Sequence, residues 1–292
     1  MQKGIVLSNI SNLYKVESEG RVYDCNARGK FKNNEISPVA GDIVQIDITD
    51  ENKLEGVIDK IEERTNYIKR PKMANITQLI LVVSIKLPKP DLFLLDKQLV
   101  YAEFMKIKPI ICLNKIDLDS ANVASEIENT YSEMGYTVIK TDAKNGIGVD
   151  KIKQYLKNNI TAFSGNSGVG KSTLLNSLLG ENISEEGVIS KKNKRGKNTT
   201  TQVRLYKIEE NSYVADTPGF STFEVSEIEK NDLAQYFIEF RKYLNDCEYG
   251  DCSHIKEEDC GIKKALTEGK ISQGRYDRYC QLMNEIEKTP KW

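Results

Sequence analysis

Residues 161–176 read TAFSGNSGVGKSTLLN, and the interpretation of the whole chain starts from this stretch. It fits the pattern G-x-x-x-x-G-K-[ST] from Gly165 to Ser172, after an apolar strand at 160–163 and before the helical segment STLLNSLL. A strand, a loop and a helix in this order are the context that a phosphate-binding loop requires. The alternative is a glycine-rich turn with a chance lysine, which the flanking strand and helix disfavour. We therefore predict a P-loop nucleotide site on a parallel α/β sheet.

The residue types of this loop suit phosphate and Mg²⁺. Its glycines let the backbone wrap closely and point N–H groups at phosphate oxygens, and Lys171 adds a charge for the β- and γ-phosphates. Ser172 offers a hydroxyl to Mg²⁺, and the helix N-terminus adds partial positive charge. The predicted nucleotide contacts of the loop are Gly165, Asn166, Ser167, Gly168, Val169, Gly170, Lys171, Ser172 and Thr173.

A second motif, NKID at 114–117, points to guanine as the base. It follows the apolar strand PIICL, so its side chains project from the carboxyl end of a strand, where parallel sheets bind ligands. Asp117 can accept hydrogen bonds from the guanine N1–H and exocyclic amine, which adenine does not offer. Asn114 can bond the base edge, and the stem of Lys115 can lie along the ring. Four residues alone are a weak signal, since a polar loop can read the same way.

A third motif, TDAK at 141–144, also follows a short apolar strand. A backbone N–H at Ala143 could meet the guanine O6, with Lys144 nearby. An ordinary polar loop is again the alternative when this motif is taken alone. Together with the phosphate-binding loop, the two motifs favour GTP, and the predicted base contacts are Asn114, Lys115, Ile116, Asp117, Ala143 and Lys144.

Two later segments are expected to sense the γ-phosphate and Mg²⁺. In DTPG at 216–219, Asp216 would hold Mg²⁺ through water and the Gly219 N–H would contact the γ-phosphate. In KNTTT at 197–201 a threonine can complete the Mg²⁺ shell; we favour Thr200, although the triplet leaves the register open and a flexible loop is the alternative. The predicted magnesium ligands are Ser172, Thr200 and Asp216.

The order of these motifs is unusual, because most GTP-binding switches place the NKxD and SAK-like elements last. All binding loops of a parallel sheet lie at one edge, so joining the old chain ends and opening another loop moves no loop in space. The motifs therefore predict a circularly permuted GTPase. As a consequence, the loops 190–201 and 216–222 lead almost directly into the C-terminal region, to which hydrolysis could be transmitted.

A cysteine and histidine cluster lies near the C-terminus in the pattern C-x4-C-x-H-x5-C. Three thiolates and one imidazole form a complete tetrahedral set for Zn²⁺ and leave no open position for catalysis, so the predicted site is structural. Unrelated free thiols beside a surface histidine are the alternative, which the spacing disfavours. The predicted zinc ligands are Cys247, Cys252, His254 and Cys260.

Length and composition indicate a globular protein of two or three domains. The chain has 292 residues, of which 39% are hydrophobic and 29% charged, and its formal net charge is −1. Any nucleic-acid contact must then come from a local basic patch. The apolar run 79–85 is too short to span a bilayer, and the N-terminal residues lack a secretory signal pattern. We expect no membrane association and a cytoplasmic location.

Patterning divides the chain into three parts. Residues 1–64 carry short strands separated by glycines, as in a small barrel or sandwich, and residues 65–224 alternate apolar strands with helices in the manner of a parallel sheet covered on both faces. Residues 225–292 are mostly helical, with a helix expected over 231–244 and another after a cap at Ser272.

Taken together, these features resemble the RsgA/YjeQ family of bacterial small ribosomal subunit biogenesis GTPases over essentially the whole chain. The resemblance rests on SPVAGDIVQI, NKID, GNSGVGKSTLLN, KNTTT, DTPGF and the cluster from Cys247 to Cys260. It implies an N-terminal OB-fold, a permuted GTPase domain and a zinc domain. It also implies binding to the small (30S) subunit and its rRNA near the decoding region in the GTP state, with release after hydrolysis. We expect a monomer.

Two positions bear on catalysis. Phe220 stands where Ras-like GTPases have a water-positioning glutamine, and a phenyl ring cannot orient water by hydrogen bonding. The family usually has histidine before the threonine triplet, whereas this chain has Asn198, which cannot act as a general base near neutral pH. The catalytic group therefore stays unassigned, and slow hydrolysis that small subunits stimulate is expected.

The run KKNKRGK at 191–197 lies beside the predicted threonine loop and offers a contact for rRNA phosphates. A solvated loop is the alternative, although OB-like barrels often bind single-stranded nucleic acid. The candidate residues are Lys191, Lys192, Lys194, Arg195 and Lys197. Two other functions stay open: a GTP-dependent binding or sensor module with incidental hydrolysis, and a zinc enzyme, which four protein ligands disfavour.

Overall fold

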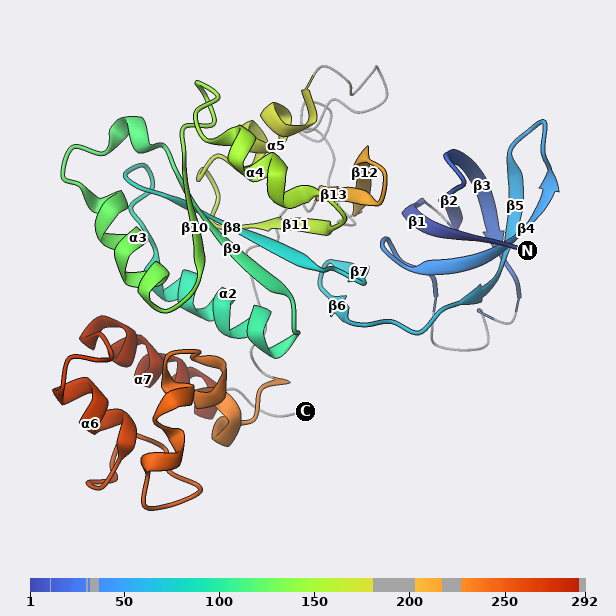
Figure 1. Ribbon diagram of the computed structural model, residues 1–292. Helices are drawn as coiled ribbons and strands as arrows, with labels where there is room; N and C mark the ends of the chain where they lie inside the picture. Colours follow the sequence, from blue (N-terminus) through green and yellow to red (C-terminus); the bar gives the residue numbers. More distant parts are fainter. Residues whose placement is uncertain (11, 30, 32–36, 181–202, 217–226, 289–292) are drawn as a thin grey trace.

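The computed structural model describes residues 1–10, 12–29, 31, 37–180, 203–216 and 227–288. A small N-terminal barrel, a central sheet with helices and a C-terminal helical part follow one another along the chain (Figure 1). The barrel lies at one edge of the central sheet, and the C-terminal part lies beneath the helix α2. None of the helices in the described part of the chain combines the length and the apolar character that a membrane span needs.

The N-terminal strands close into a five-stranded barrel. They pair in the order β1-β2-β3-β5-β4, and β4 returns to pair with β1. Among the described strand pairs of the barrel, only β3 and β5 run parallel, and this pairing is that of an OB-like barrel. The closing β1–β4 pairs decide between the barrel and the sandwich that the strand pattern left open. The strands are β1 (Gln2–Ile10), β2 (Leu13–Ser18), β3 (Arg21–Ala27), β4 (Ile43–Asp50) and β5 (Glu55–Ile61).

The central sheet contains five apolar strands, in agreement with the predicted alternation of strands and helices over residues 65–224. They run parallel in the order β10-β9-β8-β11-β13, so chain order and spatial order differ. Every residue of β8 is buried, as expected of a strand covered on both faces. The strands are β8 (Gln78–Ser84), β9 (Lys108–Asn114), β10 (Thr137–Thr141), β11 (Ile160–Ser164) and β13 (Ser212–Asp216).

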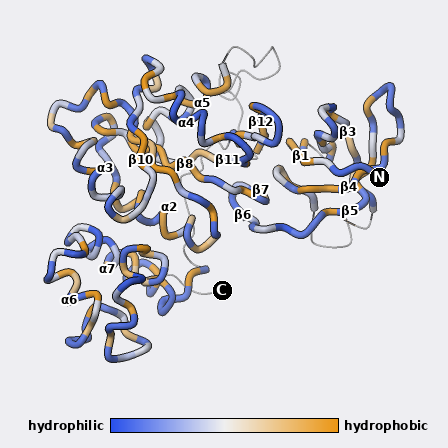
Figure 2. The backbone as a smooth tube through the Cα atoms, viewed as in Figure 1, coloured by the Kyte–Doolittle hydropathy of each residue, from blue (hydrophilic) through white to orange (hydrophobic). Residues whose placement is uncertain are grey.

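Two pairs of helices cover the two faces of this sheet. Side chains of α2 (Leu92–Phe104) and α3 (Val123–Glu133) belong to one apolar cluster, and side chains of α4 (Val149–Leu156) and α5 (Lys171–Leu179) belong to another. Figure 2 shows hydrophobic residues along the strands between these layers and hydrophilic residues in the outer loops. The sheet is therefore a two-sided core that fixes the positions of the loops at its edges.

The barrel joins the sheet through the hairpin of β12 (Arg204–Glu209) and β13, in which β12 runs antiparallel. β1 pairs with β12 at Ser8 and Arg204, so one sheet continues from the barrel into the central domain. Glu17 of the barrel also accepts hydrogen bonds from the Tyr213 hydroxyl and, at 3.0 Å, from the Lys207 ammonium. The sequence pattern does not predict β12, nor the short hairpin of β6 (Tyr67–Lys69) and β7 (Lys72–Ala74).

The C-terminal part differs from the prediction in one element. The expected helix over 231–244 is wrong: the chain forms three short 3₁₀ segments, η4 (Lys230–Tyr236), η5 (Phe240–Lys242) and η6 (Leu244–Asp246). Its backbone bonds join residues three apart, as from Phe240 N to Phe237 O at 2.9 Å. Apolar residues spaced by three and four satisfy both helix types, so the pattern could not distinguish them.

The predicted helix after Ser272 is present, and a short helix that the pattern does not predict precedes it. α6 (Gly261–Thr267) and α7 (Gln273–Lys288) pack on the 3₁₀ segments around Phe237, Phe240 and Tyr279. The Ser272 hydroxyl accepts a hydrogen bond from the Arg275 N–H at 3.2 Å, which confirms the predicted cap.

Candidate nucleotide-binding site and metal centre

The permuted motifs meet at one edge of the sheet. Because β9, β10, β11 and β13 are parallel, their carboxyl ends place Asn114, Thr141, Gly165 and Asp216 at the same edge. The order of these residues along the chain differs from the order of their strands across the sheet. This arrangement is the one that the motif order predicts for a permuted nucleotide site.

Two glycines of the phosphate-binding loop stand where no other residue fits. Gly165 has φ +142°, and a Cβ there would lie 2.2 Å from the Val82 carbonyl oxygen. Gly170 caps α5 with φ +102°, and a Cβ there would lie 2.2 Å from Nδ2 of Asn114. The loop thus passes directly over β8 and over the NKID motif, which explains the glycine spacing in physical terms.

Lys171 reaches back across the loop. Its ammonium donates to the carbonyl oxygens of Gly165 at 2.6 Å and Asn166 at 2.8 Å. Burial lowers its pKa, because the charged form is partly removed from water. A bound phosphate would favour the ammonium form, so the lysine is suited to an anionic ligand. Ser172 and Thr173 are exposed on the first turn of α5.

Asn114 ties three motifs together. Its Nδ2 donates to the carbonyl oxygen of Val169 in the phosphate-binding loop at 2.9 Å. Its Oδ1 accepts hydrogen bonds from the Thr141 hydroxyl and the Ala143 N–H, both at 3.1 Å. The side chain is buried, so these partners satisfy an amide that water does not reach.

This arrangement refines the expected base contacts. Nδ2 of Asn114 carries a second hydrogen that can meet the base edge, as predicted. The Ala143 N–H, the predicted partner of guanine O6, is directed at Asn114 and would have to be shared between the two acceptors. Both base contacts stay predictions.

The remaining NKID residues lie over the phosphate-binding loop. Lys115 adopts a left-handed conformation, and its ammonium donates to the carbonyl oxygens of Gly168 at 2.7 Å and of Leu87. Asp117 is exposed on the 3₁₀ turn η1 (Ile116–Leu118), and Ile116 packs on the apolar cluster beneath α2 and α3. An exposed carboxylate beside a lysine stem that crosses the loop is consistent with the predicted recognition of guanine.

In the TDAK turn, the side chain of Asp142 accepts hydrogen bonds from the backbone N–H groups of Lys144 at 3.1 Å and Asn145 at 3.2 Å. The carboxylate therefore closes the turn that presents Ala143 and Lys144 beside Asn114.

Asp216 lies at the end of β13, next to the strand that leads into the phosphate-binding loop. Burial raises its pKa, because the ionised carboxylate loses hydration. A nearby cation would reverse this effect, which suits a carboxylate beside Mg²⁺. Several predicted site residues lie outside the described part of the chain: Lys191, Lys192, Lys194, Arg195, Lys197, Asn198, Thr200, Gly219 and Phe220.

Sequence reasoning missed two residues that hold the loop from α2. Asp91 caps α2 through the Leu94 N–H at 2.9 Å and accepts a second hydrogen bond from Nδ2 of Asn166 at 3.1 Å. Gln98, buried in α2, donates to the hydroxyl of Ser164 at 3.0 Å, one residue before Gly165. The position of Asp91 just before a helical pattern is a capping signal that could have revealed the first of them.

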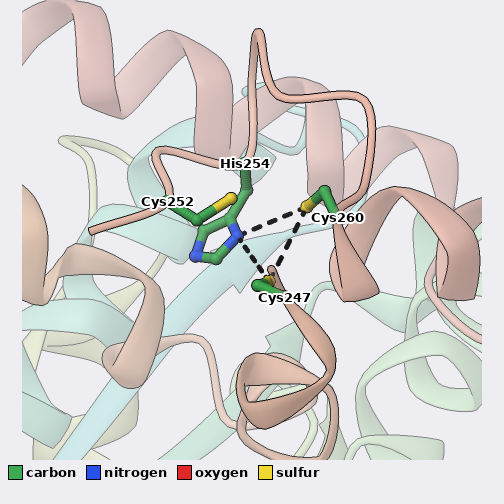
Figure 3. Close-up of side chains that lie close together, drawn as sticks. All are labelled: Cys247, Cys252, His254 and Cys260. Carbon is green, nitrogen blue, oxygen red and sulfur yellow. Dashed lines mark hydrogen bonds between the residues drawn. The ribbon is translucent and has the colours of Figure 1, made fainter. Parts of the chain in front are cut away.

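The predicted zinc ligands converge in the C-terminal part. Figure 3 shows the ring of His254 facing Cys247 and Cys260, with Cys252 beside it. Nδ1 of His254 lies 3.5 Å from Sγ of Cys247 and 3.4 Å from Sγ of Cys260. The two sulfurs are 4.0 Å apart, and all four ligand atoms lie within 4.8 Å of one another.

These distances fit a metal ion. Tetrahedral bonds of about 2.3 Å to sulfur and about 2.0 Å to nitrogen separate neighbouring donor atoms by about 3.5–3.8 Å. Burial lowers the pKa of His254 and raises that of Cys260, which disfavours imidazolium and also, without a cation, thiolate. A Zn²⁺ ion would stabilise the thiolates, and the cluster can hold one.

Hydrogen bonds fix the loop that carries these ligands. The hydroxyls of Tyr276 and Tyr279 donate to the carbonyl oxygens of His254 at 2.7 Å and Ser253 at 2.9 Å. Burial opposes ionisation of Glu257, but hydrogen bonds from Ser253 and neighbouring N–H groups outweigh it and lower its pKa to about 2. The loop is therefore held by α7 and by its own carboxylate, as structural metal sites require.

Comparisons with known proteins agree with this geometry. A family model described as RsgA GTPase matches residues 61–226, and another described as RsgA N-terminal domain matches residues 3–58. The chain belongs to the RsgA GTPase family. Family membership confirms the resemblance on which the sequence interpretation rests, and it makes the chain a GTP hydrolase. GTPases of this kind use Mg²⁺ with the nucleotide.

Relatives of the RsgA family match the chain over its whole length. A small ribosomal subunit biogenesis GTPase RsgA of Ruminiclostridium cellulolyticum is 42% identical over 100% of this chain and 96% of its own. One of Alkaliphilus metalliredigens is 40% identical over 100% of both chains.

Solved structures of RsgA relatives share the fold. YjeQ from Thermotoga maritima gives a TM-score of 0.85 at 36% identity and covers 99% of both chains. YloQ, described as a circularly permuted GTPase, gives 0.83 at 32% identity and covers 100% of this chain and 97% of its own. The barrel, the permuted GTPase domain and the helical C-terminal part with its cysteine and histidine cluster are thus confirmed as the fold class.

Proposed function

We propose that this RsgA-family GTPase couples GTP hydrolysis to late maturation of the small (30S) ribosomal subunit. The chain binds the subunit and its rRNA in the GTP state and leaves after hydrolysis. Curated relatives that match the full chain are named small ribosomal subunit biogenesis GTPases, which supports this role. The observation that carries the nucleotide part is the contact between Asn114 and Val169, because it joins the guanine motif to the phosphate-binding loop.

The proposal assigns a role to each element of the site. Asp117, Asn114 and the turn at Ala143 select guanine, Lys171 and the loop N–H groups hold the phosphates, and Ser172, Thr200 and Asp216 surround Mg²⁺. Mg²⁺ would neutralise charge on the β- and γ-phosphates. The remaining nucleotide contacts are those predicted for 165–173 together with Lys115, Ile116, Lys144 and Gly219.

The zinc cluster serves the C-terminal part as a structural site. One Zn²⁺ per chain would be held by Cys247, Cys252, His254 and Cys260, and four protein ligands leave no position for a substrate. The division into domains at 1–64, 65–224 and 225–292, a monomeric state and a cytoplasmic location are part of the proposal.

Hydrolysis by the isolated chain should be slow, because Phe220 cannot orient water. GTP turnover is therefore measured alone and with purified small and large ribosomal subunits in separate reactions. Strong stimulation by the small subunit alone supports the proposal. No stimulation by either subunit, with GTP still bound, would contradict it and favour a GTP-dependent binding module with incidental hydrolysis.

A further inference from the structure

The helix α2 contacts two sites that lie far apart in the molecule. Its N-terminal half holds the phosphate-binding loop through Asp91 and Gln98. Some of its apolar side chains pack on the sheet, and others contact the C-terminal part, which lies against α2 on the side away from the sheet (Figure 1). Val100 of α2 belongs to the same apolar cluster as Phe237 and Leu282 of that part. One helix thus lies between the nucleotide loop and the zinc-bearing domain.

A buried ion cluster fixes this contact. The guanidinium of Arg275, which is fully buried in α7, lies 2.6 Å from a carboxylate oxygen of Asp96 in α2. The same guanidinium makes two hydrogen bonds to Glu239, at 2.7 and 3.2 Å, and stacks over the Phe237 ring at 4.4 Å. Arg278 pairs with the second carboxylate oxygen of Asp96.

The position of Asp96 connects this ion cluster to the phosphate-binding loop. It lies in α2 between the N-cap residue Asp91 and Gln98, so the three side chains move together if α2 shifts. The hydroxyl of Tyr131 in α3 donates to Asp96 as well, which fixes the carboxylate from the side of the sheet. A displacement of the Asp96 end would therefore stretch the bonds to Asn166 and Ser164.

Stabilising the contact between α2 and the C-terminal part does not by itself require a buried ion cluster. An apolar pair of similar volume generally stabilises a buried contact as well as an ion pair does, because two charges lose their hydration. The contact between α2 and the C-terminal part already has apolar partners around Val100. The planar fork of Arg275 binds Glu239 through two hydrogen bonds, and its remaining nitrogen, Nη1, lies against Asp96. The guanidinium therefore sets the direction and distance between Glu239 and α2.

We propose that Arg275 is a positioning residue for the nucleotide site, which acts through Asp96 and α2 on the phosphate-binding loop. The inference rests on the proposed nucleotide role of that loop. It gives the zinc-bearing domain a route to the nucleotide through α2, separate from the predicted γ-phosphate segments 190–201 and 216–222, which precede this domain in the sequence. Coupling is reciprocal, so nucleotide binding should also tighten the docking of α7.

The test compares GDP affinity in full-length variants, measured by titration calorimetry well below the unfolding temperature of each. Arg275→Met removes the charge, and Arg275→Lys keeps it but loses the planar fork. We expect the Kd for GDP to rise at least about fivefold in Arg275→Met, which is the lower end of usual coupling strengths. Arg275→Lys should recover part of the lost affinity. A purely structural role would lower the melting temperature and leave the Kd of the folded protein unchanged.

A matched control lies on the same helix. Glu103 at the far end of α2 pairs with Arg241 at 2.8 Å, and this pair contacts the C-terminal part away from the phosphate-binding loop. Arg241→Gln should keep the wild-type Kd. An equal loss in Arg241→Gln, or a wild-type Kd in Arg275→Met, would overturn the proposal.

A second variant tests the link without touching the buried cluster. Asp91→Ser keeps a good N-cap, but its shorter side chain has one oxygen in place of the two that Leu94 and Asn166 bind separately. In the wild type, GDP should increase the protection of the amides of α7 (273–288) against hydrogen exchange. We expect Asp91→Ser to weaken GDP binding and to abolish this increase. In the double variant with Arg275→Met, Asp91→Ser should raise the Kd for GDP little further. If the two increases in Kd instead multiply, the residues act independently and a shared route is contradicted.

Failure of the coupling and failure of the nucleotide assignment are distinguishable. Lys171→Ala should lose nucleotide binding; if it binds GDP normally, the nucleotide assignment fails. If Lys171→Ala loses binding while Arg275→Met binds normally, only the coupling fails.

Discussion

The side-chain amide of Asn114 donates to the backbone carbonyl of Val169 at 2.9 Å, across 55 positions of the chain. In a GTPase with the usual motif order, this contact would join an early loop to a late one. Here the order is reversed and the contact is present, because Asn114 ends β9, the loop that carries Val169 follows β11, and the two strands run parallel in one sheet. The permutation therefore changes the connections and leaves the site in place.

Asn114→Ala should damage the whole nucleotide site. It removes the side-chain partner of the Val169 carbonyl and of the Ala143 N–H, and one of the partners of the Thr141 hydroxyl. Each buried polar group left without a partner costs about 1–3 kcal/mol. We expect lower stability in urea and weaker binding of both GTP and xanthosine triphosphate. A variant that binds normally and only changes base preference would contradict the bridging role.

Asp117→Asn should change base preference and leave stability nearly unchanged, because the side chain is exposed. An amide cannot accept both guanine hydrogens, whereas the xanthine base offers a carbonyl oxygen in place of the exocyclic amine. Competition between GTP and xanthosine triphosphate, measured by displacement of a fluorescent nucleotide, checks this change in base preference. Unaltered preference would remove Asp117 from the predicted base contacts.

The sequence predicts the strands and the chemistry better than the contacts between distant parts. Apolar runs reveal β8 and β9 because both faces of these strands are buried, and the P-loop and zinc patterns are recognisable because their chemistry needs fixed spacings. The pairing of Arg275 with Asp96 has no local signal: both are ordinary charged residues on helical segments. Their burial depends on how the C-terminal part packs on α2, which no periodicity encodes. Spacings of three and four along 231–244 likewise fit both helix types.

Charge removal in the loop 191–197 should weaken rRNA binding. Neutralising Lys191, Lys192, Lys194, Arg195 and Lys197 together should flatten the dependence of log affinity on log salt concentration, since each lost phosphate contact changes the slope by about 0.9 or less. Filter binding of 16S rRNA fragments over a salt series measures the slope. An unchanged slope would show that these residues do not contact rRNA phosphates and would favour the alternative of a solvated loop.

Loss of one zinc ligand should destabilise the C-terminal part. Cys252→Ser is expected to bind less than one Zn²⁺ per chain and to lower the unfolding temperature, because metal binding contributes directly to folding of such sites. Cys280→Ser is the matched control, since Cys280 lies in the same apolar cluster and outside the ligand set. Metal analysis of purified protein and thermal unfolding give the two readouts. Equal zinc content in both variants would contradict the ligand assignment.

Glu17 makes the attachment of the barrel depend on pH. Burial opposes ionisation of its carboxyl, but hydrogen bonds from Tyr213, Lys207 and the Gly20 N–H outweigh this effect and hold its pKa below the ordinary value of 4.5. A group with a lowered folded-state pKa stabilises the protein above its unfolded-state pKa. The contribution is thus complete at neutral pH and is lost as the pH falls below 4.5 through the folded-state pKa.

Glu17→Gln should therefore destabilise the protein at pH 7 by about 1 kcal/mol, the usual size for a partly exposed ion pair. The difference from wild type should shrink as the pH falls through the folded-state pKa of Glu17, because the wild-type carboxyl is then protonated too. Glu209→Gln, which removes an exposed carboxylate from β12, is the control for net charge. Urea unfolding across pH 3.5–7 measures both. A constant difference over this range would show that the charge of Glu17 does not hold the barrel against the β12–β13 hairpin.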